Sequence, residues 1–152
     1  MMDLTKIESP IILRGDQSTA YRDPAILYHN HVFHLFYSLV EIEDDDYIFS
    51  YTAVSTSSDL LHWTPPRKLT PRDQLLNFSS PGNVIRFQQE WWLCLQTYPR
   101  PGYTVDQIPR YGNQTSRIFI MRSIDLVNWS KPEILLVKGP QVHEEEMGRM
   151  ID

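Results

Sequence analysis

The feature that most restricts the fold of this chain is a piece of sequence that occurs twice. Residues 55–69 read STSSDLLHWTPPRKL, and residues 120–135 read IMRSIDLVNWSKPEIL. The matched pairs, each 66 positions apart (125 − 59), are Asp59 with Asp125, Leu60 with Leu126, and Trp63 with Trp129. A fixed period of this length is typical of folds that stack copies of one supersecondary unit.

The segments ahead of the two copies also match, and they carry the pattern of β-strands. Residues 24–38 (PAILYHNHVFHLFYS) resemble residues 81–97 (PGNVIRFQQEWWLCLQT), and both are rich in aromatic and β-branched residues. The 11 prolines divide the chain into short pieces, and no window shows the period of a long amphipathic helix. The expected strands lie near 25–29, 32–40, 47–56 and 63–69 in the first unit, and near 83–87, 91–98, 116–123 and 129–137 in the second.

Two tandem units of four strands predict an all-β fold, a partial β-propeller with two four-stranded blades and the start of a third. Blades of this kind pack radially around an axis because one blade cannot bury both of its faces. We expect residues 1–152 to form the N-terminal part of one propeller domain. Its blades would cover about 21–69 and about 80–137, and a third would start at about 145–152.

The repeated Ser-x-Asp-Leu-x-x-Trp piece has a structural explanation. Asp59 and Asp125 can accept hydrogen bonds from backbone N–H groups of a following tight turn. We expect Trp63 and Trp129 to open the outermost strand of each blade and to fill the space beside it. This piece therefore holds a blade together and binds no substrate.

Composition and charge exclude several classes of partner. The formal net charge is −5 and the 14 Lys and Arg residues are scattered, which argues against nucleic acid or an anionic membrane. No apolar run approaches the roughly 20 residues of a membrane helix. No secretory signal is visible, so we expect a cytoplasmic protein, or a secreted or periplasmic one if the N-terminus is incomplete. The single cysteine, Cys94, excludes an intramolecular disulfide and a multi-cysteine metal site.

One face of such a propeller collects the long loops, and we call it the upper face. It carries the loops between second and third strands and the connections between blades. The long segments at those places are 41–46, 70–80, 99–115 and 138–151. Because binding sites usually lie in loops held at one end of a rigid scaffold, we expect the functional site on the upper face.

Three equivalent positions before inner strands are expected to meet on this face: Asp23 before Pro24, Ser80 before Pro81, and Asp152. Two carboxylates in one cleft raise each other's pKa, so they need a chemical reason to coexist. Inverting hydrolysis of a glycosidic bond supplies one, because it uses a carboxylate base and a carboxylic acid roughly 6.5–9.5 Å apart. The structural alternative is that Asp23 only caps a turn before Pro24.

The Arg22-Asp23-Pro24 sequence, the two Ser-x-Asp-Leu-x-x-Trp pieces and the GRMID sequence at 148–152 resemble the five-bladed β-propeller glycoside hydrolases, especially glycoside hydrolase family 43. The resemblance covers nearly the whole chain, which spans about two blades of five. It implies that Asp23 is the general base, and that Asp152 tunes the pKa of the general acid and orients the substrate. The acid itself would be a Glu of a later blade. Families 32 and 130 are more distant relatives, and in the second of these Arg22 would serve phosphate.

The residues expected to bind substrate are Tyr21, Arg22, Phe78, Ser80 and Asn83. The family often carries an aromatic-Ala-Pro-Asp sequence before the second inner strand, where this chain has FSSPGN. Ser80 and Asn83 can still hydrogen-bond sugar hydroxyls. The two aromatic rings either stack on a sugar face or belong to the core. Arg22 either lines the sugar site or pairs with Asp23.

The sequence therefore predicts a glycoside hydrolase-like protein that cleaves O-glycosidic bonds of plant-type or other polysaccharide-derived sugars with inversion. Its partner would be an oligo- or polysaccharide, and it would need no cofactor, although the resemblance allows a calcium ion on the propeller axis. The alternative is a non-catalytic carbohydrate-binding propeller or an inactive fragment. Two blades alone would lack hydrolase activity and would self-associate through their exposed faces.

Overall fold

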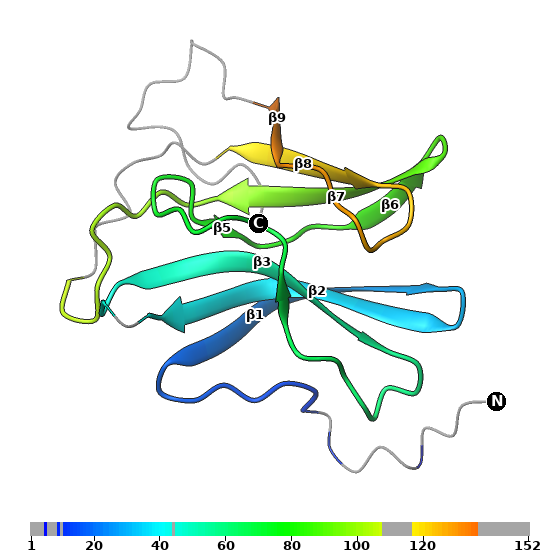
Figure 1. Ribbon diagram of the computed structural model, residues 1–152, viewed down its shortest axis with the longest axis horizontal. Coiled ribbons are helices and arrows are strands. Elements are labelled where there is room, and N and C mark those ends of the chain that lie inside the picture. Colours follow the sequence, from blue (N-terminus) through cyan, green and yellow to red (C-terminus); the bar gives the residue numbers. More distant parts are fainter. Residues whose placement is uncertain (1–4, 6–8, 10, 44, 108–116, 137–152) are drawn as a thin grey trace.

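The computed structural model describes residues 5, 9, 11–43, 45–107 and 117–136, and these form two antiparallel sheets with no α-helix (Figure 1). The first sheet has the order β1 (Thr19–His29), β2 (Val32–Ile42), β3 (Ile48–Ser57), β4 (Arg67–Lys68). The second has the order β5 (Phe78–Ser79), β7 (Glu90–Thr97), β8 (Ile118–Ser123), β9 (Glu133–Leu136), and β6 (Val84–Phe87) also pairs with β7. The predicted all-β class and the strand order of the two units are confirmed.

The fourth strand of the first sheet is much shorter than the predicted 63–69. β4 contains only Arg67 and Lys68. Pro65 and Pro66 precede it, and a proline cannot donate to the ladder, so pairing with β3 starts only after them. The fourth strand of the second sheet, β9, likewise starts at Glu133, after Pro132.

The two repeated tryptophans therefore do not open the fourth strands, as predicted, but lie in the turns before them. Each indole N–H closes its turn by donating to a backbone carbonyl: Trp63 Nε1 to Leu60 O at 3.1 Å and Trp129 Nε1 to Leu126 O at 3.2 Å. Trp129 also packs edge-on against Phe36 of the first sheet, with ring centroids 5.6 Å apart. The two indole rings do fill space beside the sheets, as predicted, but they belong to the turns and not to the fourth strands.

The predicted capping role of the repeated aspartates is confirmed. Asp59 Oδ1 accepts the backbone N–H groups of Leu61 and His62, both at 2.9 Å, and Ser57 Oγ accepts that of Leu60 at 2.9 Å. Bonds from the His62 ring and from these N–H groups hold the pKa of Asp59 well below its usual value. The second turn repeats the arrangement with Ser123, Asp125, Leu126, Val127 and Asn128.

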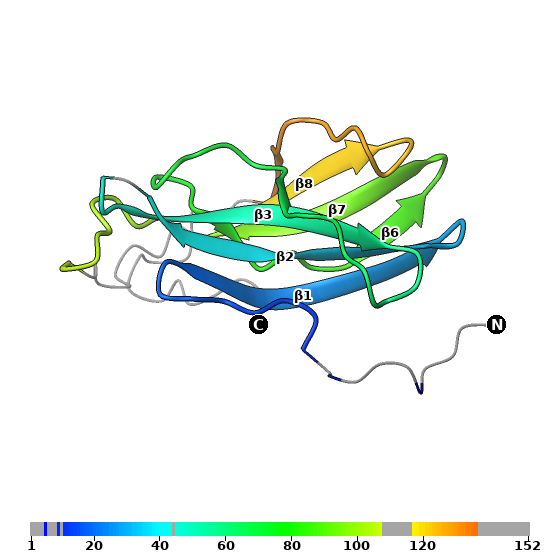
Figure 2. The same cartoon turned by 60° about the horizontal axis from the view of Figure 1, so that its bottom comes forward.

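The two sheets are neighbours in both views, and a face of one packs against a face of the other (Figures 1 and 2). The buried residues of their shared core are Phe36, Val54, Phe78, Leu93, Leu95, Phe119 and Met121. Burial of each such large side chain contributes about 1.5–3 kcal/mol, so this core fixes one sheet against the other. In the part of the chain that the structure describes, no helix is long and apolar enough to cross a membrane.

Candidate functional site

The inner strand of each sheet is interrupted at a residue that precedes a proline. In β1, Arg22 pairs with Ser38 and Ala25 with Phe36, so Asp23 and Pro24 form a bulge. In the second sheet, the interruption is longer and covers residues 80–83. It divides the inner strand into β5 and β6, both paired with β7. The predicted strand at 83–87 is therefore only the second half of this inner strand.

Asp23 and Ser80 share an uncommon backbone conformation. Their φ angles are 53° and 47°, in the left-handed region that residues other than glycine rarely adopt. Such a residue costs about 1–3 kcal/mol and tends to occur where function constrains the backbone. The shared conformation agrees with the predicted equivalence of the two positions.

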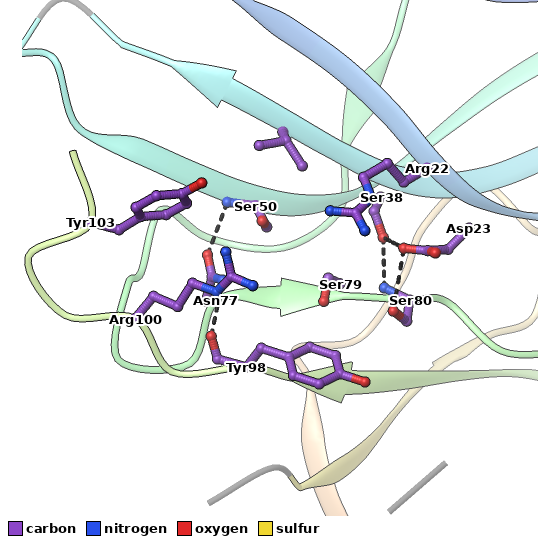
Figure 3. A pocket seen from close by; sticks show the side chains of 11 residues that line it. Arg22, Asp23, Ser38, Ser50, Asn77, Ser79, Ser80, Tyr98, Arg100 and Tyr103 are labelled. Atoms are coloured by element: carbon purple, nitrogen blue, oxygen red, sulfur yellow. Dashed lines mark hydrogen bonds between the residues drawn. The ribbon is translucent and has the colours of Figure 1, made fainter. Parts of the chain in front are cut away.

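A buried serine joins these two positions to each other. Ser38 of β2 is 1% exposed, and its Oγ donates to Asp23 Oδ2 at 2.9 Å and accepts the backbone N–H of Ser80 at 2.6 Å. Ser80 Oγ donates to the same Asp23 oxygen at 3.3 Å. Figure 3 shows the three side chains meeting between the sheets. The structure thus brings together Asp23 and Ser80, as the propeller topology predicts.

These residues form one wall of a cavity of about 130 Å³. The cavity lies on the upper face, where β2 ends and β3 begins, and loops 70–77 and 98–103 complete it. Its lining residues are Arg22, Asp23, Ser38, Val40, Ser50, Asn77, Ser79, Ser80, Tyr98, Arg100 and Tyr103 (Figure 3). Most of the lining side chains are polar, which suits a ligand with many hydroxyl groups.

Two amide side chains hold the loops around this cavity. Asn77 is 2% exposed, and it accepts the Ser50 N–H at 3.0 Å and donates to Tyr98 O at 2.9 Å. Gln74 Nε2 donates to Ile48 O at 2.9 Å and to Tyr103 O at 2.7 Å. Through these bonds the loop at 70–77 is tied to backbone groups of β3 and of the loop at 98–103.

The predicted site residues fall into two groups. Arg22, Asp23 and Ser80 line the cavity. Tyr21, Phe78 and Asn83 are not among its described lining residues, and Asp152 lies outside the residues that the structure describes.

The aromatic rings at positions 21 and 78 are packed against protein. Tyr21 contacts Tyr37 edge-on with centroids 5.6 Å apart. Phe78 is 1% exposed and packs against Phe119 at 5.3 Å, so it offers no free ring face for a sugar. Of the two roles left open for these rings, the core role is the one that the structure shows. Asn83 is exposed and is not among the described lining residues.

Several lining residues could not be identified from the sequence. Ser38 had one signal, a small polar residue within the mainly apolar run VFHLFYSLV. Asn77, Tyr98, Arg100 and Tyr103 come from loops, where no periodic pattern marks a residue that points inward.

The sequence left two roles open for Arg22, lining the sugar site or pairing with Asp23. Among the described residues, no ion pair joins Arg22 to Asp23, although they are neighbours in sequence. Arg100 lies over the ring of Tyr103, with 5.1 Å from its guanidinium carbon to the ring centroid. The described lining thus contains two guanidinium groups and one carboxylate.

The described residues offer no evident metal site. No group of three or more His, Cys, Asp and Glu side chains that could hold an ion occurs within 11–43, 45–107 and 117–136. Asp23 is the one acidic side chain among the described lining residues, so we assign no step to an axial calcium ion.

Comparison with solved structures identifies the fold. No family model and no curated protein matches this sequence. Similar structures include a glycoside hydrolase family 32 β-fructofuranosidase of Bombyx mori (TM-score 0.53, 19% identity, 82% of this chain and 24% of that one). A sucrose-6-phosphate hydrolase of Lactobacillus gasseri has a TM-score of 0.56 and 16% identity over 78% of this chain and 22% of that one. A glycoside hydrolase family 43 endo-arabinanase of Bacillus licheniformis has a TM-score of 0.50 and 15% identity over 82% and 39%.

At these identities the likeness concerns the fold alone. This chain spans between 22% and 39% of the length of those three structures. The two sheets therefore correspond to part of a β-propeller of the kind found in these glycoside hydrolases, as predicted from the repeat and the Arg-Asp-Pro sequence.

Proposed function

We propose that the natural protein that contains this chain hydrolyses O-glycosidic bonds of polysaccharide-derived sugars with inversion, and that Asp23 is its general base. The observation that carries the proposal is how Asp23 is held. Its Oδ2 accepts hydrogen bonds from Ser38 and Ser80, whereas within the described part of the chain no donor contacts Oδ1. The carboxylate is therefore fixed in orientation, exposed, and able to accept a proton.

The reaction requires a water molecule between Asp23 and the sugar. Asp23 would remove a proton from this water as the water oxygen bonds to the anomeric carbon. In the same step the bond from that carbon to the leaving oxygen breaks, and a carboxylic acid on the other side of the sugar gives its proton to the leaving oxygen. We assign that acid to a Glu outside the described residues, as the resemblance implies. Asp152 would keep the acid protonated and orient the substrate.

The test is the substitution Asp23→Asn in the natural protein, assayed on a panel of aryl glycosides and oligosaccharides. Loss of a general base should lower kcat/KM by about 10²–10⁴-fold. The matched control is Asp46→Asn, because Asp46 is also exposed and also has a positive φ (61°) but does not line the cavity. It should leave kcat/KM unchanged. Proton NMR of the first product should show the inverted anomer.

A second candidate, carbohydrate binding without turnover, is favoured by one specific observation. The described lining provides a single carboxylate, whereas inverting hydrolysis needs two. Under this alternative, the protein binds an oligosaccharide that it does not cleave, and Asp23→Asn weakens binding without any catalytic loss. Measuring both binding and turnover for the same ligand decides between the two.

A further inference from the structure

We propose that the cavity recognises a sugar that carries an anionic group, a carboxylate or a phosphate, and that Arg22 is the residue that binds this group. From the proposed function, this inference takes only the assumption that a sugar binds in this cavity. It does not require that the sugar be cleaved.

Among the described residues, the local backbone leaves the Arg22 guanidinium without a partner. The bulge and the left-handed φ of Asp23 direct its carboxylate to Ser38 and Ser80 instead of to the preceding arginine. Among the described residues, the Arg22 side chain makes no hydrogen bond or ion pair, and it is exposed. Figure 3 shows its guanidinium extending into the cavity.

Two other cationic side chains near the cavity, one arginine and one lysine, are paired with acids. Arg72 donates to Glu43 at 2.5 Å and to Asp45 at 2.6 Å, beside the cavity loops. Lys68 contacts Glu41 at 2.5 Å. The Arg22 guanidinium, which has no such pair among the described residues, therefore differs from these two neighbouring cations.

Besides Arg22, the described lining contains the Arg100 guanidinium, which can only donate hydrogen bonds, and several hydroxyl groups, which can donate or accept. The Arg100 guanidinium extends into the same space in Figure 3, and the hydroxyls of Ser50, Ser79 and Tyr103 lie around it. The one carboxylate, Asp23, already accepts two hydrogen bonds. A planar guanidinium binds a carboxylate or phosphate through two parallel hydrogen bonds. An anionic substituent on the sugar would complement these donors better than a hydroxyl.

The test compares three ligands that differ at one position: a hexose, the hexuronic acid with the same ring stereochemistry, and the hexose 6-phosphate. Binding to the natural protein is measured by calorimetry or by chemical-shift titration. An anionic ligand should bind about 10–100-fold more tightly than the neutral hexose, as expected for a charge-assisted hydrogen bond. Whether the hexuronate or the phosphate binds more tightly identifies the anion.

Arg22→Gln should remove this preference, so that the anionic sugars and the neutral hexose bind the variant with similar affinity. The control is Arg67→Gln, which removes the same charge from an exposed arginine of β4 outside the cavity, and the preference should persist. Asp23→Asn should keep or strengthen the preference, because it removes a negative charge near the bound anion.

Equal affinity for all three sugars would overturn the inference, and so would no binding of either anionic sugar at millimolar concentration. An equal loss of preference in Arg67→Gln and Arg22→Gln would also overturn it, because a general charge effect would then explain the result. If the preference holds but Asp23→Asn has normal turnover, or no sugar is cleaved, the proposed hydrolysis fails while the anion site stands.

Discussion

Ser38→Ala removes the hydroxyl that connects the two sheets at the cavity. In the variant, the backbone N–H of Ser80 loses an acceptor at 2.6 Å, and Asp23 loses a donor at 2.9 Å. A partly buried N–H left without an acceptor costs about 1–3 kcal/mol. The Asp23 bond adds about 0.5 kcal/mol, at the low end for a hydrogen bond, because that carboxylate is exposed and water replaces part of the lost interaction. We therefore expect the free energy of unfolding to fall by about 2 kcal/mol.

Urea unfolding followed by tryptophan fluorescence measures this change. The control is Ser50→Ala, since Ser50 is also buried (9% exposed) but its hydroxyl makes no hydrogen bond to described residues. That variant should lose less than about 0.5 kcal/mol. A double-mutant cycle between Ser38→Ala and Asp23→Ala should show a coupling of about 0.5 kcal/mol or more.

Two results would refute this reasoning. One is a loss in Ser38→Ala no larger than the loss in Ser50→Ala. The other is strict additivity with Asp23→Ala, because the shared hydrogen bond requires the two residues to be coupled.

Three further predictions concern single positions. Leu60 and Leu126 share a left-handed backbone (φ 65° and 63°), so glycine relieves about 1–2 kcal/mol at each. Leu60→Gly should nevertheless be near neutral, whereas Leu126→Gly should lose about 2 kcal/mol or more in urea unfolding, because Leu126 is 3% exposed. Burial would raise the pKa of Glu43, but hydrogen bonds from Tyr51 and Arg72 outweigh it and hold that pKa below its usual 4.5. The resulting stabilisation is complete above pH 4.5 and is lost as the pH falls through the folded-state value, so Glu43→Gln should flatten the fall of Tm with acid, and an unchanged slope would contradict this. Burial raises the pKa of the Cys94 thiol, so a disulfide reagent at pH 8 should modify it slowly in the native protein and much faster in urea.

The parts of the fold that follow from local sequence were predictable. The caps at Asp59 and Asp125 depend on hydrogen bonds within a few residues, so the repeated motif was sufficient to assign them. The meeting of Asp23 and Ser80 followed from the repeat itself, because equivalent positions in neighbouring blades lie at the same level around an axis.

The parts that depend on contacts distant in sequence were not predictable. Phe78 precedes Ser80 just as Tyr21 precedes the equivalent Asp23, yet only its packing against Phe119 of another strand shows that it is core. Asn77 hydrogen-bonds Ser50 across 27 positions of sequence, and no pattern in either segment indicates that pairing.

Asp23 and Ser80 share a left-handed backbone conformation although their side chains differ in chemistry. Both inner strands hold the residue before proline in the same backbone state, so the frame accepts a carboxylate in one unit and a hydroxyl in the other. Exchanging the group would then require one codon change and no rebuilding of the strand. A duplicated unit with this frame could gain or lose an acidic group while its fold stayed the same, which would let neighbouring blades acquire different roles.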